Sequence, residues 1–272
     1  MRATGAILPG KTDVSETNPV YGATHNPYDH DRSPGASNSG EASIIAAGGS
    51  PIDLASDSGG SLRLPAHHCG VATLKPTTGR IPLTGHFPRI NAMLDPRTQI
   101  GPMARSVTDL SLALPLITGI DGIDAGAMPV PLQNPEDVDL RALRVAYFVE
   151  FDDPAPDDDT RRMMASIVAA LAEDRIAVDE VALPRIEESR AITQVYWNRP
   201  HPSNWTVFDT PDPSTLSGTE VDRWLFEWDR LRRVMLRFLQ DFDVVLCPVT
   251  ECAADPHGSV DAQSCITLGP SA

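Results

Sequence analysis

The clearest periodic pattern lies in the C-terminal half of the chain, where large apolar side chains recur at helical spacing. Five of them follow one another at steps of 4, 3, 4 and 3: Trp224, Trp228, Leu231, Met235 and Phe238. This spacing predicts a long amphipathic helix with one apolar face. Just before it, Ser217–Gly218–Thr219–Glu220 has the spacing of a capping box, which predicts where the helix begins.

Short apolar runs alternate with a second helical pattern between residues 140 and 250. Leu143–Val149, Ile176–Leu183 and Phe242–Pro248 each predict a buried strand. Between the first two, Asp157–Asp159 supplies carboxylates that cap a helix start. The helical face that follows has apolar residues at i, i+3, i+4 and i+7: Met164, Ile167, Val168 and Leu171. Strand–helix–strand alternation predicts an α/β fold with a mixed, largely parallel sheet flanked by helices.

The first 100 residues have a different character, because they are rich in Gly, Ser, Pro and Asn. This composition favours turns and loops around a site. Within it, Gly40–Ala47 predicts a short buried helix and Val71–Leu74 a strand, and Val107–Thr118 predicts a helix that Pro115 kinks or ends. We therefore expect one domain over 1–272, with a Gly/Ser-rich core over 1–120 and a strand–helix–strand remainder over 140–250.

Composition and charge narrow the class of protein. Hydrophobic residues make up 41% and charged residues 22%, which is the range of globular proteins. The net charge of −15 makes nucleic acid a poor partner, because a phosphate backbone binds basic surfaces. The sequence shows neither a run long enough to span a membrane nor a signal-peptide core, so we expect a cytoplasmic protein. Its basic residues include two lysines, Lys11 and Lys75.

A phosphate-binding motif occurs near the start of the chain. Gly5–Thr12 matches the GxxxxGK[ST] pattern of a P-loop, which makes a nucleotide-binding protein one alternative. The motif works only when a buried strand enters it and a helix leaves it. Four residues precede Gly5, and Asp13–Pro19 is too broken for a helix. A short apolar strand that ends in a turn is the favoured interpretation.

Two Ser/Gly-rich stretches, 34–41 (PGASNSGE) and 56–65 (SDSGGSLRLP), are better candidates for chemistry. A serine after paired glycines suits an exposed nucleophile in a tight turn. The glycines let the backbone approach a carbonyl group and direct N–H groups at its oxygen, as in an oxyanion hole. Taken singly, each stretch is also compatible with a flexible loop.

Taken together, the two stretches resemble the amidase signature family. The resemblance runs through residues 35–76 (GASNSGEASIIAAGGSPIDLASDSGGSLRLPAHHCGVATLKP) and continues at Gly79–Arg80 and Gln99–Asp109. Gly10–Thr12, Asn26–Pro27 and the strand at Phe242–Pro248 are also similar to the family. The resemblance covers most of the chain and also accounts for the GKT sequence, since members of the family often carry an apolar run and GKT there.

The resemblance implies an amide hydrolase with a serine–serine–lysine triad, acting on a small-molecule amide without a metal or an organic cofactor. Ser61 would be the nucleophile and Ser37 the bridging serine, which in the family follows a cis peptide bond. Backbone N–H groups of Ser58, Gly59, Gly60 and Ser61 would bind the substrate's oxyanion. Asp57 and Arg63 match positions that support the loop.

The sequence also departs from the family. Gly35–Ala36 and Ser37–Asn38 stand where the family has paired glycines and paired serines, and Ser39 replaces a further glycine. The family's catalytic lysine would fall before Met1, and its members continue beyond the late strand. We therefore expect an amidase-type core that is incomplete at both ends, and a 272-residue chain that is inactive or nearly so.

Three further alternatives accompany this interpretation. A catalytically dead amidase scaffold could act as a binding or interaction module, and its uncovered edges and apolar faces would favour a homo-oligomer. His67–His68–Cys69 invites a metal site, but adjacent residues rarely converge on one ion, so packing is favoured. A Ser–His–Asp triad is disfavoured because the GxSxG pattern occurs at neither Ser37 nor Ser61.

Overall fold

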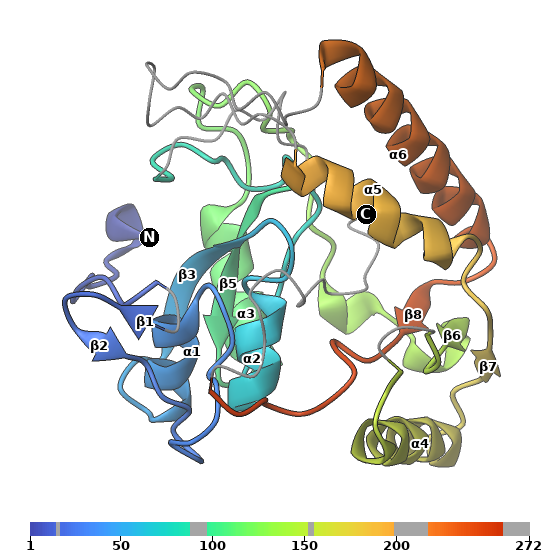
Figure 1. The fold of residues 1–272 in the computed structure, drawn as a ribbon, viewed down its shortest axis with the longest axis horizontal. Helices are drawn as coiled ribbons and strands as arrows, with labels where there is room; N and C mark the ends of the chain where they lie inside the picture. The colour runs from blue at the N-terminus through green and yellow to red at the C-terminus, as the bar shows by residue number, and fades with distance from the viewer. Residues whose placement is uncertain (15–16, 88–96, 152–154, 199–216, 258–272) are drawn as a thin grey trace. The chain divides into compact units, whose positions relative to one another are not determined.

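A computed structural model describes residues 1–14, 17–87, 97–151, 155–198 and 217–257, and these form two compact units (Figure 1). The first unit comprises Met1–Leu132 and a returning segment that begins at Ala253, and the second comprises Gln133–Cys252. The boundary lies between the two segments that the sequence distinguishes, 1–120 and 140–250. A single domain over 1–272 stays a prediction.

The first unit is built on a three-stranded antiparallel sheet in the order β3-β5-β4. Its strands are β3 (Ile52–Asp57), β5 (Gln99–Ala104) and β4 (Ala72–Thr73). The register pairs Ile52 with Ala104 and Asp57 with Gln99, so the last residue of β3 faces the first of β5. β4 lies within the strand predicted at Val71–Leu74, whereas β3 and β5 were not predicted as strands from their pattern.

Two helices, α1 (Ser39–Ala46) and α2 (Arg63–Cys69), lie side by side against this sheet (Figure 1). The buried side chains that join them to the strands form the core of the unit: Ala42, Ile45, Ala55, Leu62, Ala66, Cys69 and Met103. Helix α1 confirms the prediction for Gly40–Ala47. The sequence does not predict helix α2, because the helix has seven residues, too few for a periodic apolar face, and contains a proline.

Helix α3 (Val107–Ile117) contacts β4 and β5 and buries Leu110 and Ala113. Its N-cap is Ser106, whose hydroxyl accepts the N–H of Asp109. Pro115 lies in the last turn, and the helix ends two residues later, close to where the proline was expected to end it.

The start of the chain does not have the structure of a P-loop. A 3₁₀ helix, η1 (Arg2–Thr4), precedes Gly5, and the described residues 5–14 contain neither a strand nor a helix. The residues that enter the motif therefore form no buried strand, and Ile7 inside the motif is 90% exposed. The next elements are a short antiparallel hairpin of β1 (Thr17–Asn18) and β2 (Gly22–Ala23). The phosphate-binding alternative and the favoured short strand are therefore both wrong here.

The second unit contains the parallel sheet that the alternating pattern predicts. Its order is β7-β6-β8, with β6 (Val145–Tyr147) parallel to both β7 (Val178–Glu180) and β8 (Val244–Leu246). The helices are α4 (Asp158–Glu173), α5 (Ile186–Asn198) and α6 (Gly218–Phe238). Asp157 caps α4, and Ser217 with Glu220 forms the predicted capping box of α6. Two short 3₁₀ helices, η2 (Pro135–Asp137) and η3 (Leu140–Ala142), precede β6.

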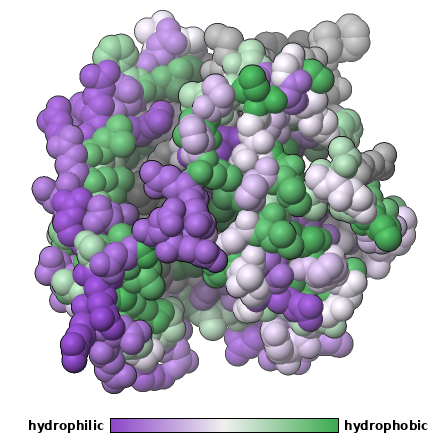
Figure 2. Space-filling model, turned by 180° about the vertical axis from the view of Figure 1, so that it is seen from behind, coloured by the Kyte–Doolittle hydropathy of each residue, from purple (hydrophilic) through white to green (hydrophobic). Residues whose placement is uncertain are grey.

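The surface carries both polar and apolar side chains, and Figure 2 shows them interspersed on one face. The most exposed large apolar residues of the first unit include Ile7, Val20, Tyr21 and Phe87, each more than three quarters exposed. Among the helices of the described ranges, none is both long enough and apolar enough to cross a bilayer.

Candidate active site

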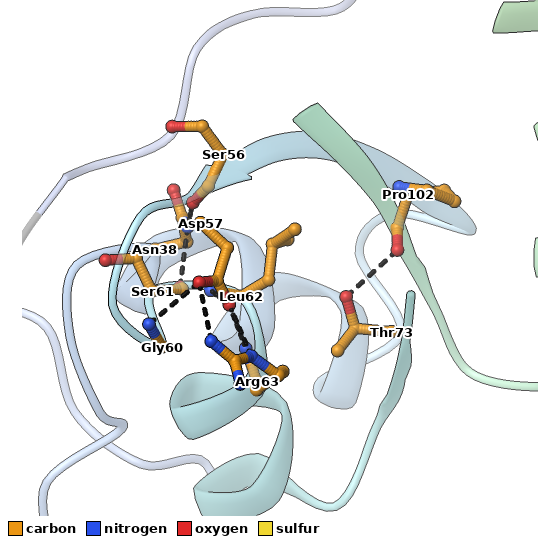
Figure 3. Close-up of polar contacts among 9 residues, drawn as sticks. All are labelled: Asn38, Ser56, Asp57, Gly60, Ser61, Leu62, Arg63, Thr73 and Pro102. Carbon is orange, nitrogen blue, oxygen red and sulfur yellow. Dashed lines mark hydrogen bonds and ion pairs between the residues drawn. The ribbon is translucent and has the colours of Figure 1, made fainter. Parts of the chain in front are cut away.

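The centre of the candidate site is the loop between β3 and α2, which is organised by the carboxylate of Asp57. Asp57 is the last residue of β3 and is fully buried. Its Oδ1 accepts the N–H of Gly60 at 2.8 Å, and its Oδ2 accepts the N–H of Leu62 at 3.2 Å and of Arg63 at 3.3 Å. Three backbone donors on one side chain fix the path of the chain on both sides of Ser61 (Figure 3).

The guanidinium of Arg63 completes this arrangement from the first turn of α2. Its Nε donates to Asp57 Oδ2 at 2.9 Å and a terminal nitrogen donates to Oδ1 at 3.0 Å, which is a bidentate pair. Burial alone would raise the pKa of Asp57, but the hydrogen bonds and charge of Arg63, the N–H of Gly60 and the charge of Lys75 outweigh it and lower that pKa. Asp57 is therefore a charged support of the loop, in agreement with the role that the resemblance implies.

Asn38 connects the two serine-rich stretches. Its side-chain Nδ2 donates to the carbonyl oxygens of Ser56 at 2.8 Å and Ser61 at 2.6 Å, and its backbone N–H donates to Ser61 O at 3.4 Å (Figure 3). The residue that departs from the family's paired serines thus holds the segment of Ser37 against the segment of Ser61. The peptide bond between Ala36 and Ser37 is cis, as the resemblance implies.

Two glycines of the site are required by the backbone. Gly35 has φ +80°, and a Cβ on it would lie 2.8 Å from the Cα of Pro65 in α2. Another side chain would therefore push the serine-rich segment away from α2. Gly60 has φ +126°, which lets the chain turn into Ser61. The N–H of Gly60 donates to the carboxylate of Asp57. Gly60 therefore shapes the turn, and its N–H is already engaged within the protein.

Two further side chains, Thr98 just before β5 and His86, contact residues of the same site. The hydroxyl of Ser58 is hydrogen-bonded to that of the fully buried Thr98. The Nε2 of His86 lies 2.8 Å from Oγ of Ser56, the residue whose carbonyl Asn38 holds. These contacts come from residues 30 to 40 positions away in sequence, and no local pattern indicates them.

The structure brings the predicted site residues into one region. Ser61 lies at the entrance to α2 and Ser37 just before α1, both half-buried, and the hydrogen bonds of Asn38 join their segments. Ser58, Gly59 and Gly60 form the turn between Asp57 and Ser61. The catalytic and substrate-binding roles of these residues stay predictions. Sequence reasoning noted Asn38 as a departure from the family but missed its contacts, and it missed His86 as part of this region.

The alternative metal site at His67–His68–Cys69 is not formed. The Sγ of Cys69 donates to the carbonyl of Pro34 at 3.6 Å, and Nδ1 of His68 lies 3.3 Å from the carbonyl of Ser33. Burial raises the pKa of the Cys69 thiol to about 11, which opposes the thiolate that a metal needs. Throughout the described ranges, no group of three or more His, Cys, Asp or Glu side chains is arranged to hold a metal ion.

Comparison with known proteins gives consistent matches. The profile of the family described as Amidase matches residues 1–228. A glutamyl-tRNA(Gln) amidotransferase subunit of Geobacillus kaustophilus is 33% identical over 219 residues, which cover 77% of this chain and 44% of that protein. The protein of the same name from Chloroflexus aggregans is 38% identical over 196 residues, covering 67% of this chain and 38% of that protein.

Solved structures agree in fold. 6-Aminohexanoate cyclic dimer hydrolase complexed with substrate matches with a TM-score of 0.81 and 24% identity, over 97% of this chain and 62% of that chain. A crystal structure described as an amidase matches with a TM-score of 0.73 and 25% identity, over 98% of this chain and 64% of that chain. The chain spans about half the length of the curated relatives it matches. Both the predicted α/β fold class and the resemblance are confirmed, and the chain belongs to the amidase family.

Proposed function

We propose that this chain carries the nucleophile, the bridging serine and the oxyanion donors of an amidase that cleaves a C–N bond through a serine acyl-enzyme. The observation that carries the proposal is the loop held by Asp57, which presents Ser61 beside the segment of Ser37. A serine nucleophile needs such a fixed turn, because its hydroxyl must meet the carbonyl carbon in one orientation. The activity and substrates of the whole protein are part of the proposal.

In this mechanism the Ser61 Oγ forms a bond to the carbonyl carbon of the amide while its proton passes to Ser37. The tetrahedral oxyanion then collapses, the C–N bond breaks, and the amine leaves with the proton that Ser37 relays. Water then attacks the acyl carbon of the resulting ester by the same route. The bond between Ser61 Oγ and the acyl carbon breaks, the carboxylic acid leaves, and Ser61 regains a proton through Ser37. A base must receive the proton during the relay, since a serine hydroxyl is weakly nucleophilic at neutral pH.

The geometry of the loop refines which donors would serve the oxyanion. The N–H groups of Leu62 and Arg63 donate to Asp57, as does that of Gly60. Gly60 therefore sets the turn, and we propose, on the ground of the family resemblance, that other backbone N–H groups of the stretch from Ser58 to Ser61 bind the oxyanion. Loss of one such donor typically lowers kcat by about 10²–10³-fold.

Covalent labelling tests the nucleophile directly. A fluorophosphonate incubated for many hours with the 272-residue chain should form one adduct slowly, since neither lysine of the chain matches the family's base, and peptide mass spectrometry should locate the adduct on Ser61. Ser61→Ala should remove the adduct. Ser111→Ala is the matched control, because Ser111 is exposed on α3 and bonds only within its own helix in the contacts described, to the carbonyl of Val107. An adduct that persists on another serine in Ser61→Ala would overturn the assignment.

The second candidate function is a non-catalytic amidase scaffold that acts as an interaction module. The exposed apolar side chains of the first unit favour it, because Ile7, Tyr21 and Phe87 are each more than three quarters exposed. Light scattering distinguishes the two candidates. A folded chain that associates and takes no fluorophosphonate even after prolonged incubation supports the module, and a monomer that forms the Ser61 adduct excludes it.

We propose a small-molecule amide as the substrate class, on the ground of the family. The relatives' names include one component of an amidotransferase and a cyclic dimer hydrolase. A panel of glutamine, a long-chain fatty amide, an aryl amide and a cyclic amide, assayed for released ammonia or amine, separates the classes. Turnover of any one that disappears in Ser61→Ala supports the proposal.

A further inference from the structure

Three of the chain's seven histidines, His25, His30 and His257, gather at one place on the first unit. The rings of His25 and His30 stack with their centroids 5.6 Å apart, and the ring of His257 meets His25 edge-on at 5.0 Å. His25 and His30 are exposed and His257 is half-buried, so solvent reaches the cluster. The residues of the candidate active site do not contact it in the hydrogen bonds described.

The neighbourhood of these rings is fixed by the backbone, although His25 and His257 lie 232 positions apart. The N–H of Ser33 donates to the carbonyl of Asp255 at 2.7 Å, and the N–H of His257 donates to the carbonyl of Asp31 at 3.1 Å. Arg32 and Pro256 form an antiparallel bridge between these two contacts. The returning segment therefore lies along residues 31–33, and this pairing brings the imidazole of His257 to His25.

The atoms at the centre of the cluster have the separations of ligands around one metal ion. Nδ1 of His25 lies 3.2 Å from Nε2 of His257 and 3.0 Å from the carbonyl oxygen of His30. Two Zn–N bonds of about 2.05 Å at a tetrahedral angle place their nitrogens about 3.3 Å apart. We propose that His25 and His257, with the carbonyl of His30, form a surface site for a divalent transition metal ion such as Zn²⁺, completed by water.

The chemistry of the donors selects this class of ion. Two imidazoles favour Zn²⁺, Ni²⁺ or Cu²⁺ over Mg²⁺ or Ca²⁺, which prefer sites made of oxygen ligands alone. Nδ1 of His25 lies within hydrogen-bond distance of both the carbonyl of His30 and Nε2 of His257. Since a carbonyl can only accept, Nδ1 carries the ring proton when it bonds to the carbonyl of His30. The metal ion takes the place of that proton, which is released to solvent. The ion would thereby fasten the returning segment to the N-terminal part of the unit.

Isothermal titration of the 272-residue chain, free of any histidine tag, with ZnCl₂ tests the site. We expect the wild type to bind one equivalent of Zn²⁺. His25→Gln and His257→Gln should each raise the Kd for Zn²⁺ at least about tenfold, because each variant loses one ligand. Glutamine keeps a hydrogen-bonding side chain, so both variants should fold, and circular dichroism melts without metal check this. The same Zn²⁺ should raise the melting temperature of the wild type and not that of either variant.

Two controls make the result specific. His67→Gln removes a histidine of α2 outside the cluster and should bind Zn²⁺ like the wild type, whereas loss of binding in that variant would place the metal elsewhere. His30→Ala keeps the carbonyl ligand and should retain affinity within about threefold of the wild type. Absence of Zn²⁺ binding, several equivalents bound with equal strength, or unchanged affinity in both glutamine variants would overturn the proposal. If either variant unfolds, two imidazole nitrogens on Cu²⁺ in the wild-type electron paramagnetic resonance spectrum support the site, and their absence overturns it.

Discussion

Asp57 shows how one buried charge can define a site. The carboxylate is fully buried, but Arg63 and three backbone N–H groups surround it. Asp57→Asn would leave the guanidinium without its partner and would lose the bidentate geometry. Breaking a buried pair from one side costs about 3–5 kcal/mol. We expect the variant to lose about 3 kcal/mol in its free energy of unfolding, measured with urea at pH 7.

The pH dependence of this loss has a definite sign. The pKa of Asp57 in the folded protein lies below its ordinary value, so the charge stabilises the fold above the unfolded-state pKa of about 3.9. That contribution falls as the pH drops through the folded-state pKa, and the difference between wild type and Asp57→Asn should shrink there. Asp229→Asn is the control, because its pair with Arg233 is exposed and should contribute little at any pH. A constant difference throughout the acid range would contradict this account.

Cys69 provides a second test at the residue scale. Burial raises the pKa of its thiol to about 11, and the side chain is fully buried in the core of the first unit. The thiolate is the form that alkylating reagents attack. We expect iodoacetamide under mildly alkaline conditions to label the half-exposed Cys247 and Cys252 before Cys69, as followed by peptide mass spectrometry. As a control, the denatured protein should label Cys69, Cys247 and Cys252 at similar rates. Early labelling of Cys69 in the native protein would contradict the prediction.

The residues of the site differ in how far the sequence predicts them. The serine positions 37 and 61 follow from the resemblance, because the family motif is a local string of residues. The contacts of Asn38 and the direction of the Gly60 N–H do not follow, since both depend on where β3 ends relative to α1. A sequence motif therefore predicts which residues belong to the site, while the hydrogen bonds that orient them require the fold.

At the scale of elements, the capping box of α6 gives a clear prediction. The hydroxyl of Ser217 accepts the N–H of Glu220, and the side chain of Glu220 accepts the N–H of Ser217. Ser217→Ala removes the first of these bonds and should cost about 1 kcal/mol in the free energy of unfolding. Thr219→Ala is the matched control, because it changes an exposed residue in the same turn that has no capping role. Equal losses in both variants would show that helix propensity rather than capping is responsible.

Elements with a local signature were predicted and elements without one were not. Helices α4 and α6 have both a periodic apolar face and a capping residue, so their existence follows from neighbouring residues. Strand β3 has the sequence IDLASD, in which polar residues interrupt any apolar pattern, and its pairing partner β5 lies over forty positions away. Helix α2 contains Pro65 in its first turn and spans one short segment, so no periodic face develops. Tertiary contacts, which the local pattern does not contain, therefore determine that β3 is a strand and α2 a helix.

At the scale of the whole molecule, the identity of the proton acceptor decides how much activity the 272-residue chain has. The chain contains two lysines, and neither matches the family's catalytic base. Lys11 is exposed, and the charge of Lys75 acts on Asp57 as part of the loop's support. Positioned proton transfer typically contributes about 10²–10⁴-fold, so we expect slow amide turnover from the oxyanion donors alone.

Three variants assayed beside the wild type test this expectation. Lys75→Ala should change amide turnover less than about twofold, since Lys75 takes no proton from Ser61 in the proposed relay. Ser61→Ala should abolish whatever turnover the wild type shows. Lys75→Arg separates charge from basicity, because arginine keeps the positive charge beside Asp57 but stays protonated at neutral pH. A loss of turnover in both Lys75→Ala and Lys75→Arg, with unchanged stability, would identify Lys75 as the base and show that the relay ends within this chain.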